Sequence, residues 1–225
     1  MEIAYQGTDY VVIDKPAGLP VNKNRHMTLD AEYVNKIAGK QWQQNIFNPH
    51  KLDAKTSGLL ILCFNKETTA LFNTMFARQE IKKSYGAIVK GDVPEKGIIE
   101  TPVYDRKKKK KLPAVTRFER LQTVYTGDTD KSGEDLYLNL LRIQPETGRW
   151  HQIRQHLSSL KYDIIGDTQH GDWDLNKSIT ASFGFRRMFL HASELSFPEP
   201  GSGKQVRVIS PLPEEFDLLL EKMTT

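Results

Sequence analysis

A continuous apolar run, Leu59-Leu60-Ile61-Leu62, is the feature that most constrains how this chain can fold. It has no polar alternation and ends at Cys63-Phe64-Asn65, which predicts a strand buried on both faces in the middle of a sheet. Directly before it comes His50-Lys51-Leu52-Asp53-Ala54-Lys55-Thr56-Ser57-Gly58, a turn-like stretch with one carboxylate. A rigid strand fixes the residues beside it, so Asp53 is a candidate active-site carboxylate. The structural alternative is an Asx-turn in which Asp53 binds only its own backbone.

Composition indicates an ordinary soluble globular chain. Its 225 residues are 38% hydrophobic and 27% charged, enough for one large domain or two small lobes. We expect no membrane association, because no apolar run is long enough to cross a bilayer and no N-terminal leader is recognisable. The single cysteine, Cys63, predicts a buried thiol in a reducing compartment. We therefore expect a cytoplasmic protein, and a monomer.

Positive charge is concentrated in one window. Between Tyr104 and Arg120 there are eight basic and two acidic residues, a net charge of +6, whereas the whole chain carries +4. Five of the basic residues are consecutive: Lys107, Lys108, Lys109, Lys110 and Lys111. A lysine run is usually a solvated loop, but this concentration favours a polyanionic partner, with nucleic acid as the leading candidate.

Periodicity and breaker residues predict an α+β fold with a mainly antiparallel sheet and flanking helices. Expected strands are 10–14, 59–62, 82–91, 114–121, 136–144, 189–191 and 206–209, with a loop over 125–133. Expected helices are 28–38 with Thr28 as N-cap, 66–79 with Asn65 as N-cap, one from Trp150 onward and 213–223. The apolar stripe of the second helix is expected to be Leu71, Phe72, Met75 and Phe76.

The helix expected from Trp150 carries a second dense cluster of polar residues. Ile153, Leu157 and Leu160 share its apolar face, and Arg154 lies next to that face, where its guanidinium can point inward; a surface arginine is the alternative. Two histidines, His151 and His156, are five positions apart and do not match the spacing of helical zinc ligands, so we predict no metal site.

Five segments occur together and in a fixed order. They are the stretch around Asp53, Lys83-Ser84-Tyr85-Gly86-Ala87-Ile88-Val89-Lys90-Gly91, Pro113-Ala114-Val115-Thr116, Thr147-Gly148-Arg149-Trp150-His151-Gln152-Ile153-Arg154 and Phe189-Leu190-His191-Ala192. In this combination the chain resembles the pseudouridine synthases of the RluA family, from about Ile3 to Ile209. Within that family it most resembles the tRNA pseudouridine synthase C branch, through the Pro-Ala-Val-Thr strand and Ile165-Gly166-Asp167-Thr168-Gln169-His170-Gly171-Asp172.

The resemblance implies a fold and a set of roles. It implies the pseudouridine synthase fold, with a mixed, mainly antiparallel sheet and a central RNA-binding cleft between two lobes. We expect a single catalytic domain over residues 1–225, without an N-terminal S4-type module. Asp53 is implied as the nucleophile, Arg154 as its ion-pair partner and Tyr85 as the aromatic that stacks on the base; without the resemblance, Tyr85 reads equally well as a core aromatic.

RNA contacts are expected from His50, Lys51, Arg149, His151 and the lysine run 107–111. Lys51 departs from the family, which usually has arginine there to enter the RNA stack in place of the flipped uridine. Lysine keeps the charge but lacks the planar stacking group.

The implied reaction is isomerisation of a uridine in RNA, with tRNA favoured over ribosomal RNA. A flipped uridine is attacked by the carboxylate at C1′ or passes through an elimination at the ribose, and both routes stay open. No cofactor or metal is implied. A non-catalytic RNA-binding protein is the rival class, although Asp53, Tyr85 and Arg154 are all present. A hydrolase would need a second carboxylate, and none lies in these segments.

Overall fold

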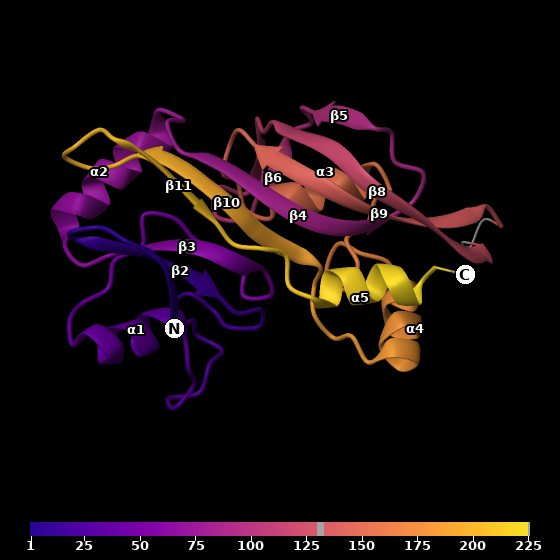
Figure 1. The fold of residues 1–225 in the computed structure, drawn as a ribbon, viewed down its shortest axis with the longest axis horizontal. Helices are drawn as coiled ribbons and strands as arrows, with labels where there is room; N and C mark the ends of the chain where they lie inside the picture. The colour runs from indigo at the N-terminus through magenta and orange to yellow at the C-terminus, as the bar shows by residue number, and fades with distance from the viewer. Residues whose placement is uncertain (130–132, 225) are drawn as a thin grey trace. The chain divides into compact units, whose positions relative to one another are not determined.

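The structure is a computed structural model that describes residues 1–129 and 133–224, and its chain divides into two compact units (Figure 1). The first unit contains Met1–Lys83 and Ala192–Pro211, and the second contains Ser84–His191 together with the residues from Leu212 onward. The chain passes between the units within strands β4 (Lys82–Lys90) and β10 (Leu190–Pro198).

In the first unit the strand order is β1-β2-β3-β10, with β11 pairing β10. These strands are β1 (Glu2–Gln6), β2 (Tyr10–Lys15), β3 (Ser57–Cys63), β10 and β11 (Gln205–Ile209). The pairs β1–β2, β2–β3 and β10–β11 are antiparallel. All seven residues of β3 are buried, which confirms the strand predicted from the apolar run and its central place. This strand is the rigid element that follows Asp53.

Helix α2 (Lys66–Ala77) begins where the sequence predicts. The side chain of Asn65 accepts a hydrogen bond from the Thr68 amide at 2.8 Å and so caps the first turn. Phe72 is fully buried and packs edge-on against Tyr10, with 4.9 Å between the ring centroids. The assignment of Leu71 to the apolar stripe is wrong, because this residue is 49% exposed. The inward face of α2 is therefore narrower than its composition suggests.

Helix α1 (Val34–Trp42) begins six residues later than the predicted start at Thr28, so that prediction is wrong. Loop carbonyls take the place of a capping side chain: the amides of Val34 and Asn35 donate to the carbonyls of Pro20 and Val21 at 2.9 and 3.1 Å. Leu29, expected on the buried stripe, is 90% exposed. The tertiary contact with residues 16–21, called the proline loop below, sets this boundary, and the helix propensity of residues 28–38 does not reveal it.

In the second unit the strand order is β4-β9-β8-β5, and the pairs β4–β9, β8–β9 and β5–β8 are antiparallel. The remaining bounds are β5 (Lys96–Ile99), β8 (Thr116–Thr129) and β9 (Asp135–Pro145), with β6 (Val103–Asp105) and β7 (Lys110–Leu112) as a separate hairpin. Strand β8 continues through Tyr125–Thr129, where a loop was predicted. There Tyr125 pairs with Tyr137, and their ring centroids lie 5.5 Å apart. Residues 130–132 of the predicted loop lie outside the described part of the chain.

Two hydrophobic clusters form on β4 and β9, whose residues alternate between them. One cluster contains Ala87, Val89, Leu141 and Ile143 with Ile153 and Leu157 of α3 (Gln152–Ser159). The other contains Ile88, Leu138 and Leu140 with residues of α4 (Trp173–Phe183) and α5 (Glu215–Lys222), which lie near each other in Figure 1. Leu160 follows the end of α3 and is 43% exposed, contrary to expectation.

The described residues thus confirm the predicted α+β class with mainly antiparallel pairing. Helix α4 was not predicted from the sequence. Among the described helices, none combines the length and apolar character needed to span a membrane.

Gly58 provides a test of the packing beside Asp53. Its φ is +102°, and an added Cβ would lie 2.7 Å from the backbone nitrogen of Ala192 and nearer still to its carbonyl oxygen. We expect Gly58→Ala to lower the free energy of unfolding by about 1–3 kcal/mol more than Gly18→Ala, because backbone crowding adds to the positive-φ cost. Gly18 is the matched control, with φ +87° and no atom within 4 Å of the place that a Cβ would occupy. Equal losses in urea unfolding would contradict this packing.

Candidate functional site

A buried lysine anchors the turn that carries Asp53. Lys15 has no exposed surface, and its ammonium donates to the carbonyls of Ala54, Pro16 and Leu19 at 3.0, 2.8 and 3.0 Å. The Ala54 carbonyl also accepts from the Gly18 amide at 2.8 Å. Asp53 itself is half-buried. These bonds tie the proline loop to the Asp53 turn, so the carboxylate is carried by a fixed backbone and not by a mobile loop.

The turn is closed by backbone atoms: the Thr56 amide donates to the Asp53 carbonyl at 3.1 Å. Thr56 and Ser57 are buried, and Ser57 begins β3. Closure of the Thr56 turn therefore does not require the Asp53 carboxylate.

His50 is held by the strand that follows Asp53. Its Nε2 atom accepts a hydrogen bond from the Ile61 amide at 2.9 Å, so the neutral ring carries its proton on Nδ1. Burial, and then the charge of Lys83, lower the pKa of His50 to about 3. Burial also lowers the pKa of Lys83 to about 8. His50 is thus a neutral support of β3, whereas the neighbouring Lys51 is exposed.

Tyr85 lies near the start of β4 in the second unit, opposite Ile143 of β9. Its side chain is half-buried and packs against the cluster that contains Ala87 and Val89. A tyrosine at this place has one part of its ring supported by the core and another part accessible to solvent.

Gln152 joins two of the segments that the sequence singled out. Its Oε1 atom accepts from the Thr147 hydroxyl at 2.7 Å and the Arg149 amide at 3.0 Å. Its Nε2 atom donates to the Val115 carbonyl at 2.9 Å and the Thr116 hydroxyl at 3.0 Å. The turn before α3 is thereby fixed to the Pro-Ala-Val-Thr strand. The Arg149 side chain is exposed and donates to the Pro113 carbonyl at 3.2 Å.

His156 extends this network on the same helix. Its Nδ1 and Nε2 atoms lie 2.8 Å from the Thr116 hydroxyl and the Thr101 carbonyl. A carbonyl only accepts, so Nε2 carries the proton and Nδ1 accepts from Thr116. Burial lowers the pKa of His156, and the bond to Thr101 only partly opposes that effect. His156 is therefore a neutral structural residue.

Arg154 points inward, and its guanidinium forms a bidentate ion pair with Asp167. Nε donates to Oδ2 at 2.7 Å and Nη2 donates to Oδ1 at 2.8 Å. The two side chains are only 7% and 1% exposed. Oδ1 also accepts from the amides of Gln169 and His170 at 2.9 and 3.1 Å. This geometry confirms that Arg154 is not a surface arginine.

Two opposing effects act on the pKa of Asp167. Burial raises it, but the hydrogen bonds from Arg154, the amides of Gln169 and His170 and the charge of Arg154 together outweigh burial and lower the pKa below its ordinary value. The carboxylate is ionised at neutral pH and fixes the orientation of the guanidinium. Asp167 was noted only as part of a Gly/Asp-rich segment, and no local signal in the sequence identifies it as the partner of Arg154.

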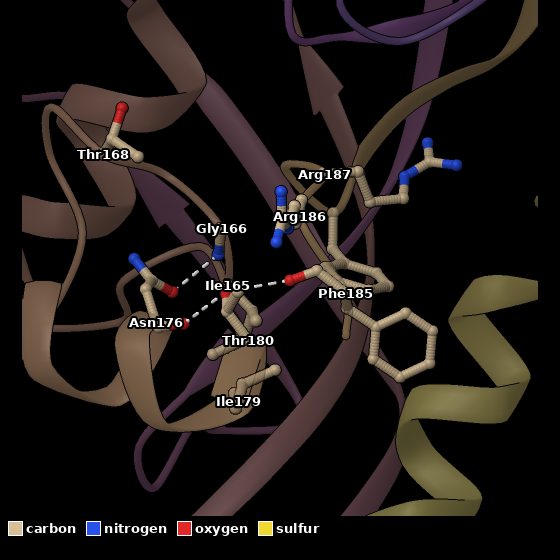
Figure 2. A pocket seen from close by; sticks show the side chains of 10 residues that line it. Ile165, Gly166, Thr168, Asn176, Ile179, Thr180, Phe185, Arg186 and Arg187 are labelled. Atoms are coloured by element: carbon tan, nitrogen blue, oxygen red, sulfur yellow. Dashed lines mark hydrogen bonds between the residues drawn. The ribbon is translucent and has the colours of Figure 1, made fainter. Parts of the chain in front are cut away.

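Helix α4 fixes the loop that carries Asp167, beside a small cavity of about 60 Å³ (Figure 2). Asn176 of α4 accepts from the Gly166 amide at 2.6 Å and donates to the Asp167 carbonyl at 3.1 Å. The Thr180 hydroxyl donates to the Phe185 carbonyl at 2.9 Å across the same pocket, as Figure 2 shows. Gly166 has φ +79°, and a Cβ there would overlap the Arg187 carbonyl. Only glycine fits before Asp167.

Lys107, Lys108 and Lys109 lie in the turn of the β6–β7 hairpin. Lys110 and Lys111 begin β7, and all five lysines are exposed. Oδ1 of Asp105 accepts from the amides of Lys107 and Lys108 at 2.9 and 2.8 Å, which shapes the turn. The hairpin is tied to α3, because Gln155 accepts from the Tyr104 amide at 3.0 Å and donates to its carbonyl at 3.1 Å. The positive hairpin is therefore held on the helix that carries Arg154.

The predicted catalytic residues are distributed over both units. Asp53 belongs to the first unit, and Tyr85 and Arg154 belong to the second. The predicted ion pair between Asp53 and Arg154 stays a prediction. Within the described residues, no group of three or more His, Cys, Asp or Glu side chains is placed to hold a metal ion.

The buried ion pair predicts a specific dependence of stability on pH. A folded-state pKa below the ordinary value means that Asp167 stabilises the fold above the unfolded-state pKa, about 3.9, and that this stabilisation is lost as the pH falls further. We expect Asp167→Asn to lower the free energy of unfolding at pH 7 by about 3 kcal/mol, because it removes the negative charge that the buried guanidinium binds at 2.7 and 2.8 Å.

The difference between parent and Asp167→Asn should narrow below about pH 4 in urea unfolding followed by circular dichroism. Asp92→Asn is the control, because that carboxylate is in the same unit and exposed. A difference that is constant from pH 7 to about pH 3, or one as small as that of the control, would contradict the ion pair.

The chain is similar over almost its whole length to several known proteins. The chain is 31% identical to the tRNA pseudouridine synthase C of Vibrio vulnificus, with 99% of this chain and 95% of the relative covered. It is 33% identical to the protein of the same name from Vibrio cholerae, with the same coverage, and 32% identical to that of Salmonella typhimurium, with 96% and 87% covered.

Two solved human structures have the same fold. RNA Pseudouridylate Synthase Domain Containing 4 matches with a TM-score of 0.75 and 24% identity over 99% of this chain and 92% of that one. RNA Pseudouridylate Synthase Domain Containing 1 matches with a TM-score of 0.72 and 21% identity over 99% and 94%. Residues 9–159, which carry four of the five segments and both Asp53 and Arg154, match the RNA pseudouridylate synthase family model. The chain belongs to the RNA pseudouridylate synthase family, and its activity is the isomerisation of uridine in RNA to pseudouridine.

Proposed function

We propose that this enzyme acts on a specific uridine of tRNA, as a cytoplasmic monomer. The observation that carries the choice of RNA is the similarity, over almost the whole chain, to relatives that are named for tRNA. Ribosomal RNA is the alternative substrate. The reaction is an isomerisation without redox change or an external group donor, so it requires no cofactor.

We assign the role of nucleophile to Asp53. A nucleophilic carboxylate must be ionised and held in a fixed place, and the backbone around Asp53 is fixed by Lys15 and β3. Two routes are open: the carboxylate of Asp53 attacks C1′ of the ribose, or the reaction begins with an elimination at the ribose. In either case the uracil detaches, rotates and forms its new bond through carbon.

Arg154 is proposed to keep Asp53 ionised. A guanidinium beside a carboxylate favours the charged form, and this one is itself oriented by Asp167. Asp167 binds the guanidinium through Nε and Nη2, and His151 binds it through Nη1, so the group proposed to act on Asp53 is held in a fixed orientation.

Tyr85 is proposed to stack on the flipped uracil. The base must leave its stack before the carboxylate can reach the sugar, which costs a few kcal/mol and less in an unpaired loop. A half-buried ring supported by the hydrophobic cluster of the second unit is a suitable platform for it.

The remaining predicted RNA contacts differ in how available their side chains are. Lys51 and Arg149 are exposed and can reach phosphates. His50 uses Nε2 within the protein, whereas His151 uses both ring nitrogens, so the contribution proposed for His151 is the shape of the surface and not a phosphate contact.

Asp53→Asn tests the catalytic assignment. The amide has nearly the same shape but is not a nucleophile, so we expect loss of pseudouridine formation by at least about a thousandfold, with RNA affinity and the free energy of unfolding close to those of the parent. Single-turnover assays on unmodified tRNA transcripts measure the rate. Asp9→Asn makes the same chemical change at an exposed site of the same unit and should behave like the parent. Substantial turnover by purified Asp53→Asn would rule out Asp53 as the nucleophile.

The choice of RNA is tested by mapping pseudouridines in total tRNA and ribosomal RNA. Cells that lack the gene are compared with cells that carry the parent or Asp53→Asn. A tRNA site that requires the parent and is not restored by Asp53→Asn supports the proposal. A dependent site in ribosomal RNA alone would favour the alternative, and a phenotype rescued by Asp53→Asn would indicate a non-catalytic RNA-binding role.

The hairpin predicts a salt-dependent contribution to RNA binding. Each phosphate contact that is lost should reduce the slope of log affinity against log salt by roughly 0.7–0.9. We expect replacement of Lys107–Lys111 by serine to weaken binding at low salt and flatten this slope, while the rate on saturating RNA changes little, because phosphate contacts position the RNA without touching the base.

A control with the same loss of charge separates this local effect from the net charge of the protein. Serine replaces five exposed lysines outside the hairpin: Lys66, Lys161, Lys177, Lys204 and Lys222. If both variants flatten the slope equally, or if the hairpin variant leaves it unchanged, the hairpin is a solvated turn.

A further inference from the structure

A chain of hydrogen bonds behind Arg154 fixes which ring nitrogens carry protons. Nη1 of Arg154 lies 3.0 Å from Nε2 of His151, and Nδ1 of His151 lies 3.0 Å from Nε2 of His170. A guanidinium has only donors, so Nε2 of His151 must be the acceptor and carries no proton. His151 is therefore neutral, with its proton on Nδ1.

The same logic fixes His170. Nδ1–H of His151 donates to Nε2 of His170, so that atom is also unprotonated and the proton of His170 is on Nδ1. A proton on Nε2 of either ring would place two donors face to face. The chain from Asp167 through Arg154 and His151 to His170 exists only while both imidazoles are neutral.

Packing holds the two rings in this arrangement. Trp150 stacks on His151 with 3.8 Å between centroids and an interplanar angle of 21°, and His170 meets His151 edge-on at 5.2 Å and 86°. The backbone of His151 is left-handed, with φ 49° and ψ 29°, directly before α3. That backbone conformation is uncommon for residues other than glycine and is strained. Such strain is typically retained where it places a side chain in the position that its function needs.

Charged groups around the rings come from α3, the loop after it, the N-cap of α4 and strand β4. Arg154 of α3 faces His151, and Asp167 of the following loop accepts the His170 amide. Asp172 caps α4 two residues after His170, where Lys90 of β4 binds it at 2.7 Å. Each of these carboxylates already has a cationic partner, and Arg154, which directly contacts His151, opposes protonation of that ring.

We propose that His151 and His170 are positioning residues for Arg154, which rests on the catalytic role proposed for that arginine. Asp167 holds one edge of the guanidinium and the neutral histidine pair holds Nη1, so the group is fixed on two sides. Protonation of either ring breaks the second attachment. The rate of isomerisation then falls on the acid side through loss of the Arg154 geometry, in addition to any titration of Asp53.

The proton positions are tested first by nitrogen-15 NMR of the imidazoles in the full-length protein without RNA. At pH 7.5 we expect both His151 and His170 to be neutral with the proton on Nδ1, and His170→Gln, whose amide oxygen replaces Nε2 as the acceptor, to leave the tautomer of His151 unchanged. A proton on Nε2 of His151 would overturn the proposal. This measurement does not depend on catalysis.

The positioning role is tested by single-turnover rates on unmodified tRNA transcripts across about pH 5.5–8, the range in which an ordinary histidine titrates. His151→Phe keeps an aromatic ring against Trp150 but removes the acceptor, and we expect a loss of about tenfold or more at pH 7.5. His151→Gln restores an acceptor oxygen that does not titrate. It should recover most of that loss and reduce the fall in rate toward acid pH.

The outcomes separate this inference from the proposed function. His26→Gln removes an exposed histidine of the first unit and should keep the parent pH profile. If His151→Phe, confirmed to be folded by its unfolding curve, has the rate and pH profile of the parent, the positioning role is overturned while the catalytic assignment stands. If Asp53→Asn is fully active, the proposed mechanism fails, and the NMR tautomers still decide whether the histidine pair holds Arg154.

Discussion

The buried ion pair between Arg154 and Asp167 is the interaction on which the rest of the second unit depends. Removing two charges from water is expensive, and it is tolerated only where geometry and further hydrogen bonds compensate. Here the pair is bidentate, and two backbone amides complete the carboxylate. The two amides reach the carboxylate because the loop around Asp167 is tight. That loop conformation needs glycine at position 166 and is held by the hydrogen bonds of the Asn176 side chain.

The first unit meets the same problem with a different device. The buried ammonium of Lys15 is surrounded by three backbone carbonyls, and one of them belongs to Ala54, next to Asp53. Backbone carbonyl dipoles hold this cation, and the bonds join two loops. In each unit, therefore, a buried cation binds one partner that is distant in the sequence, Ala54 for Lys15 and Asp167 for Arg154. Each cation either is a residue proposed for catalysis or fixes the backbone beside one.

Elements with strong internal patterning were predicted well. The apolar run of β3 and the Asn65 cap of α2 are local signals, because each depends on residues within a few positions. Predictions of where an element begins or ends failed where backbone groups distant in the sequence set that boundary. The start of α1 is set by carbonyls of the proline loop, and the far end of β8 is set by pairing with β9, which overrides the turn-like composition of residues 125–129.

For the site, the sequence by itself singled out the residues that are proposed to carry the chemistry. The sequence alone shows the order and spacing of the segments that contain Asp53, Tyr85 and Arg154. The apolar stripe beside Arg154 also predicts that its side chain points inward. Only the tertiary structure decided what holds those residues. Asp167 is 13 positions from Arg154, and Val115 is 37 positions from Gln152, so neither pairing leaves a periodic or local trace. The physical reason is that a buried polar group must find a partner of the correct geometry, and the fold brings that partner from anywhere in the chain.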